Sequence, residues 1–274
     1  MKGIITFIQN LNIMKNAIKE RKTAFITGAS SGIGEVFARR LAEDGYDLAL
    51  TARRGELLEK LALELQARYL IKTEIILADL SKLPDIQRLE KHISNMKNLE
   101  MLVNNAGFGI KTGNFDQSDI DKQTNMITVH ITAPVRLCRA ALPAMTANKK
   151  GFIINVSSMA SFTPIPKGIN YGATKTYLNF FSEGLQRELN GTNIKVQALC
   201  PGFTYTGFHD TKEFEPDHRE HIPKTMWSSA ESVVEESLRA LKKNKVIVVP
   251  GFKNRLFVGM RPIIQPLIVW LRKK

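Results

Sequence analysis

A chain of 274 residues with an ordinary globular composition can form one large domain with a full hydrophobic core. Its two cysteines, Cys138 and Cys200, lie far apart, which excludes a disulfide framework and a cysteine metal site and indicates a reducing, cytoplasmic compartment. The formal net charge is +13, but +10 of it falls in residues 1–22 and 251–274, and the chain lacks the interleaved basic and aromatic pattern of a nucleic-acid-binding surface.

The two basic ends also contain apolar stretches. Apolar residues near the N-terminus have the spacing of an amphipathic helix, and no signal-peptide cleavage site follows them. The apolar stretch 256–271 is interrupted by two prolines, an arginine and a glutamine, so we expect no membrane span there. Two interpretations stay open: peripheral contact with an anionic membrane, or packing on the core or in the interface of a homo-oligomer, a dimer or tetramer.

Between these ends, short apolar runs alternate with longer segments of helical pattern. In chain order, we expect strands at residues 24–27, 48–51, 74–78, 101–103, 152–156, 195–199 and 246–249. We expect helices at 33–43, from the second strand to about residue 69, and at 85–96, 119–147, 171–189 and 228–243, the last opened by a capping box from Ser228 to Glu231. This alternation predicts an α/β fold of right-handed βαβ units around a parallel sheet.

No repeat, linker or low-complexity tract divides this pattern. We therefore expect a single domain over residues 22–250, with a basic amphipathic extension at 1–21 and a basic apolar tail at 251–274. Residues 203–228 are rich in Thr, Phe, His and Pro, and we expect them to form a mobile flap over a site.

A glycine-rich turn separates the first strand from the first helix. It reads Thr27-Gly28-Ala29-Ser30-Ser31-Gly32-Ile33-Gly34. Glycine tolerates positive φ and lets the backbone approach a ligand closely, and the free N–H groups at a helix start bind pyrophosphate. The turn therefore predicts a dinucleotide site, with a purely structural tight turn as the alternative.

The end of the second strand predicts which dinucleotide binds. An NAD site usually has an acidic residue about 20 residues after the glycine turn. Here Ala52 occupies that place and is followed by Arg53 and Arg54, whose guanidinium groups favour a 2′-phosphate. We therefore predict NADP, although both arginines could simply begin an exposed helix.

Tyr171 and Lys175 lie four residues apart on a predicted helix and share one face of it. An ammonium group beside a phenol favours the phenolate, so we expect Lys175 to lower the pKa of Tyr171. A tyrosine with such a pKa can give and take a proton near neutral pH. A solvated helix face is the alternative interpretation.

Together these motifs resemble the short-chain dehydrogenase/reductase family over about residues 22–250. The resemblance implies a single-domain Rossmann-type fold, a doubly wound parallel sheet with helices on both faces. It also implies that Asp79 and Leu80 contact the adenine. Two further segments would line the cofactor: Asn104-Asn105-Ala106-Gly107, and Pro201-Gly202 with Thr204 and Thr206.

The resemblance further implies a catalytic set. Tyr171 would donate the proton in carbonyl reduction, Lys175 would hold the nicotinamide ribose, and Ser158, thirteen residues before Tyr171, would hydrogen-bond the substrate oxygen. Ser157 is the alternative serine. The cofactor would carry the hydride while the protein supplies orientation and charge. No metal is expected.

One position departs from the family pattern. The family usually has an asparagine in the helix before the fifth strand, where it anchors a water of the proton relay, and here His130 takes its place. His130 could serve as a titratable relay group, or it could be a neutral, hydrogen-bonded core residue.

The flap suggests the class of substrate. Phe203, Tyr205, Phe208 and Trp227 indicate an apolar or lipid-like ketone, aldehyde or alcohol, unless these rings pack within the flap itself. Two functions without turnover remain as alternatives: a cofactor-binding regulatory protein, and a membrane-surface scaffold that uses the basic ends.

Overall fold

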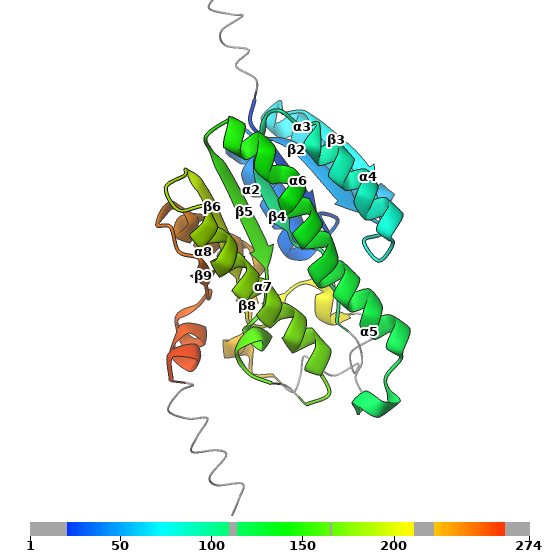
Figure 1. Cartoon of the computed structure of the whole chain (residues 1–274), viewed down its shortest axis with the longest axis vertical. Helices are drawn as coiled ribbons and strands as arrows, with labels where there is room; N and C mark the ends of the chain where they lie inside the picture. The colour runs from blue at the N-terminus through cyan, green and yellow to red at the C-terminus, as the bar shows by residue number, and fades with distance from the viewer. Residues whose placement is uncertain (1–20, 110–113, 165, 211–221, 261–274) are drawn as a thin grey trace, which may run out of the picture.

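Seven parallel strands form the central sheet, in the order β3-β2-β1-β4-β5-β6-β9 (Figure 1). The computed structural model describes residues 21–109, 114–164, 166–210 and 222–260. The strands are β1 (Thr23–Thr27), β2 (Asp47–Ala52), β3 (Thr73–Leu77), β4 (Leu99–Asn104), β5 (Gly151–Val156), β6 (Ile194–Leu199) and β9 (Ile247–Val248). The predicted α/β fold with a doubly wound parallel sheet is confirmed.

Helices cover both faces of this sheet. One face carries α2 (Gly32–Glu43), α3 (Gly55–Tyr69) and α8 (Ala230–Lys242). The other carries α4 (Leu83–Ser94), α6 (Ala133–Ala147) and α7 (Ile169–Glu188), which lie side by side in Figure 1. Within the described residues, no helix is both long and apolar enough to cross a bilayer.

The strands are apolar on both faces because each face packs on helices. In β1, Ala24 and Ile26 face the core under α2, α3 and α8, whereas Phe25 faces the core under α4 and α6. All three side chains are fully buried. This alternation explains why the first strand is a continuous apolar run in the sequence.

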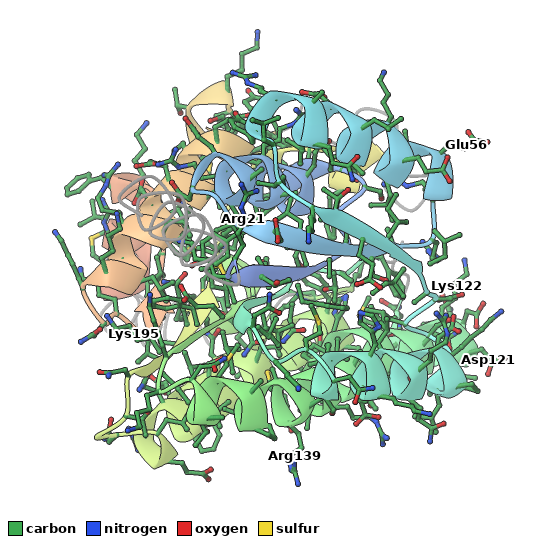
Figure 2. All side chains as sticks on the ribbon, turned by 90° about the horizontal axis from the view of Figure 1, so that it is seen from above. Arg21, Glu56, Asp121, Lys122, Arg139 and Lys195 are labelled. Carbon is green, nitrogen blue, oxygen red and sulfur yellow. The ribbon has the colours of Figure 1, made fainter. Side chains whose placement is uncertain are left out.

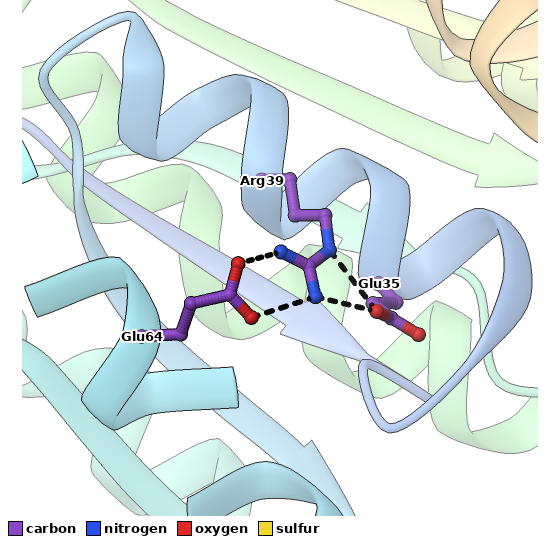
Figure 3. Close-up of polar contacts among 3 residues, drawn as sticks. All are labelled: Glu35, Arg39 and Glu64. Carbon is purple, nitrogen blue, oxygen red and sulfur yellow. Dashed lines mark hydrogen bonds and ion pairs between the residues drawn. The ribbon is translucent and has the colours of Figure 1, made fainter. Parts of the chain in front are cut away.

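Charged side chains cover the outside of the helices, where Glu56, Asp121 and Arg139 point away from the molecule (Figure 2). Another surface residue, Arg39, connects two helices. It lies on α2 and donates to Glu35 in its own helix and to Glu64 of α3 (Figure 3). Exposed ion pairs of this kind contribute little to stability.

The long helical region before β5 contains a wide turn that the sequence pattern does not predict. It begins as α5 (Ile120–Ile127), capped by Asp119, whose carboxylate accepts the N–H groups of Asp121 and Lys122. A π-helical turn, η2 (Thr128–Thr132), follows and leads directly into α6. Such turns accommodate one extra residue in a helix and often occur at functional sites.

The segment between β6 and α8 is closed by two short strands, one near each of its ends. Strand β7 (Thr204–Tyr205) pairs in parallel with β8 (Ser228–Ser229), and residues 211–221 between them lie outside the described part. The N-cap of α8 is Ser229, which accepts the N–H of Ser232, so the capping box predicted from Ser228 is wrong by one residue. Short 3-10 turns are η1 (Phe115–Gln117), η3 (Met159–Phe162), η4 (Gly207–Asp210) and η5 (Lys224–Met226), and residues 252–260 are helical.

Candidate active site

A large open cavity lies at the carboxyl ends of the strands. Its volume is about 1870 Å³, whereas pockets for one drug-sized molecule measure roughly 300–1000 Å³. It therefore has room for a dinucleotide and a second molecule. The predicted site residues that line it are Gly28, Ser30, Ser31, Gly32, Ile33, Arg53, Arg54, Asp79, Leu80, Asn105, Ala106, Gly107, Ser158, Tyr171, Lys175, Pro201, Gly202, Thr204 and Thr206.

The glycine turn needs its glycines for two reasons. Gly28 and Gly32 have φ values of 65° and 61°, in the left-handed region that other residues rarely adopt. Neighbouring chain also leaves no room for side chains: a Cβ at Gly28 would lie 2.9 Å from Ala106 Cα, and one at Gly34 would lie 2.4 Å from Gly28 O. Gly34 thus lies behind the turn and allows it to pack tightly.

The loop after β4 is hydrogen-bonded to this turn. Thr27 Oγ1 accepts the N–H groups of Asn105 (2.9 Å) and Ala106 (3.0 Å). The side-chain amide of Asn105 donates in return to Thr27 O and Gly28 O. These bonds hold two backbone segments together as one wall of the cavity.

The start of α2 has the features of an anion site. Its N-cap, Ser31, makes no capping hydrogen bond through its side chain, so the first N–H groups of the helix are left for a ligand. The bare glycine surface in front of them lets a phosphate approach the backbone. The residues present therefore fit the pyrophosphate of a dinucleotide.

The two arginines after β2 have different surroundings. Arg54 turns onto the glycine turn, where Nε and Nη2 donate to Ser30 Oγ (3.2 and 2.9 Å) and Nη2 also donates to Ser31 Oγ. Arg53 is exposed at the rim of the same cavity. Both guanidinium groups lie where a phosphate beside the glycine turn could be bound.

Tyr171 and Lys175 of α7 reach the cavity beside Ser158, which follows β5. Ser158 hydrogen-bonds the Tyr171 phenol, and its Oγ also accepts the N–H of Ala160 at 3.1 Å. The hydroxyl of Ser157 donates instead to Lys175 O at 2.9 Å and is buried. This geometry favours Ser158 over Ser157 as the serine available to a substrate.

The predicted effect of Lys175 on Tyr171 is not found in the free protein. Burial raises the pKa of the Tyr171 phenol, and the hydrogen bond to Ser158 offsets this only partly. Lys175 Nζ lies 5.7 Å from the centre of the tyrosine ring and donates to Val156 O at 2.9 Å. Burial also lowers the pKa of Lys175 to about 8, so the lysine still carries most of its charge at neutral pH.

His130 differs from the other predicted catalytic residues because it lies behind the cavity wall. It is 1% exposed, on the π-helical turn. The N–H of Phe108 donates to its Nε2 at 3.1 Å, and its Nδ1 lies 3.0 Å from Thr174 Oγ1. Burial and the nearby charge of Lys175 hold its pKa well below the usual value, so the imidazole is neutral.

The flap aromatics divide into two groups. Phe203 and Phe208 line the cavity, and the Phe208 ring lies 6.1 Å from that of Tyr171. Tyr205 stacks on Trp227 at 4.9 Å, and Trp227 also packs on Phe203. Phe203 and Phe208 thus face the cavity, whereas Tyr205 and Trp227 pack within the flap.

Thr204 and Thr206 follow the same loop. Thr204 is buried and its hydroxyl donates to Gly202 O, whereas Thr206 lies against Gly32, where a Cβ would be 3.0 Å from the Thr206 Cβ. Thr206 thus lies next to the start of α2.

Some residues around the cavity carried no signal in the sequence. Phe108 and Thr174 contact His130 from segments 22 and 44 residues away, and no short-range pattern connects them. The mouth of the cavity carries large apolar side chains that are 47% to 73% exposed: Phe115, Ile169, Met226, Phe252 and Phe257. Their partial exposure depends on the fold and is not visible in composition.

In open α/β sheets, ligands bind outside the carboxyl ends of the strands, where the strand order reverses. The chain reverses its order between β1 and β4, and the cavity lies at that point. The fold and the site therefore define a Rossmann-type nucleotide-binding protein. A family model described as short chain dehydrogenase matches residues 22–216, and the chain belongs to this family of oxidoreductases.

Individual relatives agree with this assignment. The chain is 35% identical over 188 residues to very-long-chain 3-oxoacyl-CoA reductase-A of Danio rerio, covering 68% of this chain and 59% of that protein. It is 33% identical over 210 residues to inactive hydroxysteroid dehydrogenase-like protein 1 of Homo sapiens, covering 76% and 64%. The chain thus spans less than two thirds of the length of these relatives.

A solved structure matches over a longer part of the chain. It is a short-chain dehydrogenase from Sphingobium yanoikuyae in complex with NADPH, similar with a TM-score of 0.80 and 30% identity. The match covers 90% of this chain and 95% of the other.

Proposed function

We propose that this protein is an NADP(H)-dependent oxidoreductase that interconverts a carbonyl group and a primary or secondary alcohol on an apolar or lipid-like substrate. The observation that supports this most is the meeting of Ser158, Tyr171 and Lys175 in one cavity with the glycine turn. Its volume of about 1870 Å³ leaves space for substrate beside the dinucleotide.

Each catalytic side chain has one task in this proposal. A nicotinamide cofactor held by the glycine turn would supply the hydride. Tyr171 gives its phenolic proton to the carbonyl oxygen, which Ser158 orients by a hydrogen bond. Lys175 would hold the nicotinamide ribose. The raised pKa of Tyr171 suits a group that keeps its proton until the reduction step.

Two observations support NADP over NAD. The last residue of β2 is Ala52, where an NAD site usually has an acidic residue, and both Arg53 and Arg54 line the cavity with Ser30 and Ser31. The similar structure from Sphingobium yanoikuyae contains NADPH. Guanidinium groups bind phosphate well because their forked donors match its oxygens.

The mouth of the cavity supports an apolar substrate. Phe115, Ile169, Phe252 and Phe257 surround the entrance and are each more than half exposed. An acyl chain longer than the cavity would cover them. The name of the zebrafish relative, a very-long-chain 3-oxoacyl-CoA reductase, points to the same class.

We further propose one catalytic domain over residues 22–250, a cytoplasmic location and assembly into a homo-oligomer. Peripheral membrane contact through the basic ends is the second possibility for residues 1–21 and 251–274. The similarity to a human protein named inactive favours keeping one rival, a cofactor-binding protein without turnover.

The experiment follows NADPH oxidation with a panel of apolar ketones, aldehydes and 3-oxoacyl thioesters. Tyr171→Phe should lower kcat by a factor of about 100 or more, because the proton is needed in the chemical step, and should leave the Kd for NADPH unchanged. Lys175→Ala should lower kcat and also raise the Kd for NADPH. The matched control is Tyr177→Phe, an exposed tyrosine on the same helix.

Two results would contradict this proposal. Wild-type kcat in Tyr171→Phe would remove the assigned proton donor. Tight NADPH binding by the wild-type protein with no turnover of any substrate would favour the regulatory alternative.

A further inference from the structure

His130 sits at a junction of three segments that border the proposed active site. It occupies the middle of the π-helical turn, and its partners are Phe108 in the loop after β4 and Thr174 on α7. Thr174 lies between Tyr171 and Lys175 on the same helix. The imidazole therefore connects the cofactor-lining loop with the helix that carries the catalytic pair.

The hydrogen bonds determine which nitrogen carries the proton. The backbone N–H of Phe108 can only donate, so Nε2 must be the acceptor. A neutral imidazole then has its proton on Nδ1, which donates to Thr174 Oγ1. The Thr174 hydroxyl in turn donates to Tyr171 O at 2.8 Å. Every polar atom in this chain of bonds has a partner, and each has a defined direction.

The rings and the neighbouring glycine hold the imidazole from both sides. Its ring centre lies 5.6 Å from that of Phe108 and 5.8 Å from that of Tyr171, both edge to face. A Cβ at Gly107 would lie 3.0 Å from Nε2 and 3.6 Å from Lys175 Nζ. The space beside Gly107 is thus filled by the imidazole and the catalytic lysine.

We infer that His130 is a positioning residue that fixes the Asn105–Phe108 loop against α7, and that it carries no proton during turnover. This inference rests on the proposed function of the site. A relay group must release one hydrogen bond and form another in each cycle, whereas both nitrogens of His130 are engaged away from the cavity. A protonated ring would also direct an N–H at the N–H of Phe108.

The charged and titratable groups around His130 also favour the neutral form of its imidazole. The titratable groups that contact it or act on it in the described residues are Tyr171 and Lys175 of α7. A neutral phenol does not favour an imidazolium, and an ammonium opposes it. This set contains no carboxylate, the kind of group that would stabilise a charged imidazole ring.

Four variants test the inference. His130→Phe keeps a ring and removes both nitrogens, whereas His130→Gln restores an acceptor and a donor on one side chain. Thr174→Val removes the partner hydroxyl. The matched control is Thr128→Val, on the same π-helical turn, where the hydroxyl donates within its own helix to Thr124 O.

The measurements are the Kd for NADPH by fluorescence, kcat against pH, and the solvent deuterium isotope effect on kcat. We expect His130→Phe to weaken NADPH binding by a factor of about 5 to 50, because the loop loses its buried hydrogen bond. His130→Gln should recover most of this loss, Thr174→Val should show a smaller loss, and Thr128→Val should show none. The midpoint of the pH profile and the isotope effect should stay unchanged in all four.

A relay role would give the opposite pattern. A shifted pH midpoint or an altered isotope effect in His130→Phe, with unchanged NADPH binding, would overturn the inference, as would a glutamine variant no better than the phenylalanine variant. If His130→Phe does not fold, the comparison of Thr174→Val with Thr128→Val decides on the same readouts. The NADPH series needs no turnover, so its result stands apart from failure of the proposed reaction.

Discussion

Lys175 is buried, and its ammonium group donates to Val156 O. Burying the charged ammonium group lowers the stability of the folded state at neutral pH. Burial lowers its pKa from 10.5 to about 8. A cost of this kind is common at functional sites, where a charged group is placed for a ligand and not for stability.

The cost predicts a pH-dependent effect of Lys175→Met in the cofactor-free protein. Between pH 8 and 10.5 the unfolded chain keeps the Lys175 proton and the folded chain does not, so wild-type stability rises with pH through this window. At neutral pH the folded protein carries the full desolvation cost, at most about 3 kcal/mol. Lys175→Met should therefore raise Tm at neutral pH, and the gain should shrink as the pH passes from about 8 to 10.5.

Thermal melts across this pH range check the prediction, with the exposed Lys91→Met as the control. A gain in Tm that stays constant with pH would show that packing of the methionine is responsible, and not relief of a buried charge.

The proposed preference for NADP also depends on single residues. Both arginines are exposed, but Arg54 is already hydrogen-bonded to Ser30 and Ser31 beside the glycine turn, in a position to meet a phosphate there. We expect Arg54→Ala to raise the Kd for NADPH by a factor of about 10 to 100, with a smaller effect from Arg53→Ala. The Kd for NADH should change little in either, because NADH lacks the 2′-phosphate.

Titration of both dinucleotides against the wild type and both variants measures this. Wild-type binding of NADH as tight as that of NADPH would contradict the proposed preference. A larger loss in Arg53→Ala than in Arg54→Ala would assign the phosphate to the other arginine.

At the scale of elements, a buried polar network joins the middle of the sheet to two helices. Asn104 of β4 donates to Asn155 Oδ1 on β5 at 2.8 Å and also to Cys138 Sγ on α6 at 3.3 Å. Asn155 donates to Ser182 Oγ on α7 at 2.9 Å. Asn155 and Ser182 are fully buried, so the network links β4, β5, α6 and α7 away from water.

We predict that Asn155→Ala lowers the free energy of unfolding by about 2–4 kcal/mol, because it removes the partner of the buried Asn104 donor and of the buried Ser182 acceptor and opens a small cavity. Urea unfolding monitored by circular dichroism measures this. Asn148→Ala, at an exposed asparagine that donates to Lys97 O, should cost far less. Equal costs would mean that the network adds nothing to stability.

The sequence predicts most elements well because their patterns are local. Each predicted strand is present within one or two residues, since runs such as Ala24 to Thr27 are buried on both faces. The glycine turn is similarly readable because positive φ and close packing both demand glycine at residue 28.

Other features could not be read because they depend on contacts between distant segments. Periodicity gave one helix over 119–147 and missed the wide turn at Thr128–Thr132, since the apolar pattern continues through it. The pKa of Tyr171 went in the opposite direction to the prediction, because spacing reveals a neighbouring lysine but not burial. The different surroundings of Arg53 and Arg54 likewise appear only when β2 is placed beside the glycine turn.

In the molecule as a whole, the two ends of the described chain lie on opposite sides along the direction of the strands (Figure 1). Arg21 and Lys22 lead into the amino end of β1, whereas the cavity lies at the carboxyl ends of the strands. Phe252, Lys253 and Phe257 of the helical segment 252–260 line the cavity mouth. The segment 252–260 therefore borders the cavity, and Arg21 and Lys22 are remote from it.

We predict that removing residues 1–13 leaves turnover of a soluble substrate nearly intact and weakens binding to anionic vesicles or changes oligomer size. The removed stretch carries the apolar face of the predicted amphipathic helix and one basic residue, Lys2, whereas the other basic residues of this end, from Lys15 onward, remain. Burial of the apolar face should therefore account for most of the loss, and the remaining charge attraction to lipid decreases with salt. Vesicle co-sedimentation at low and high salt, with neutral lipid as the control, and size in solution test this. No change in either assay would show that the stretch has neither role.

The joined base of the flap also gives the protein an optical reporter. Of the two tryptophans, Trp227 stacks on Tyr205 and packs on Phe203, which itself lines the cavity. Replacing Trp270 by phenylalanine would leave Trp227 as the single tryptophan, which can be excited apart from the tyrosines. Its fluorescence should then respond when a ligand displaces Phe203, so movement of the flap could be followed in real time without any added label.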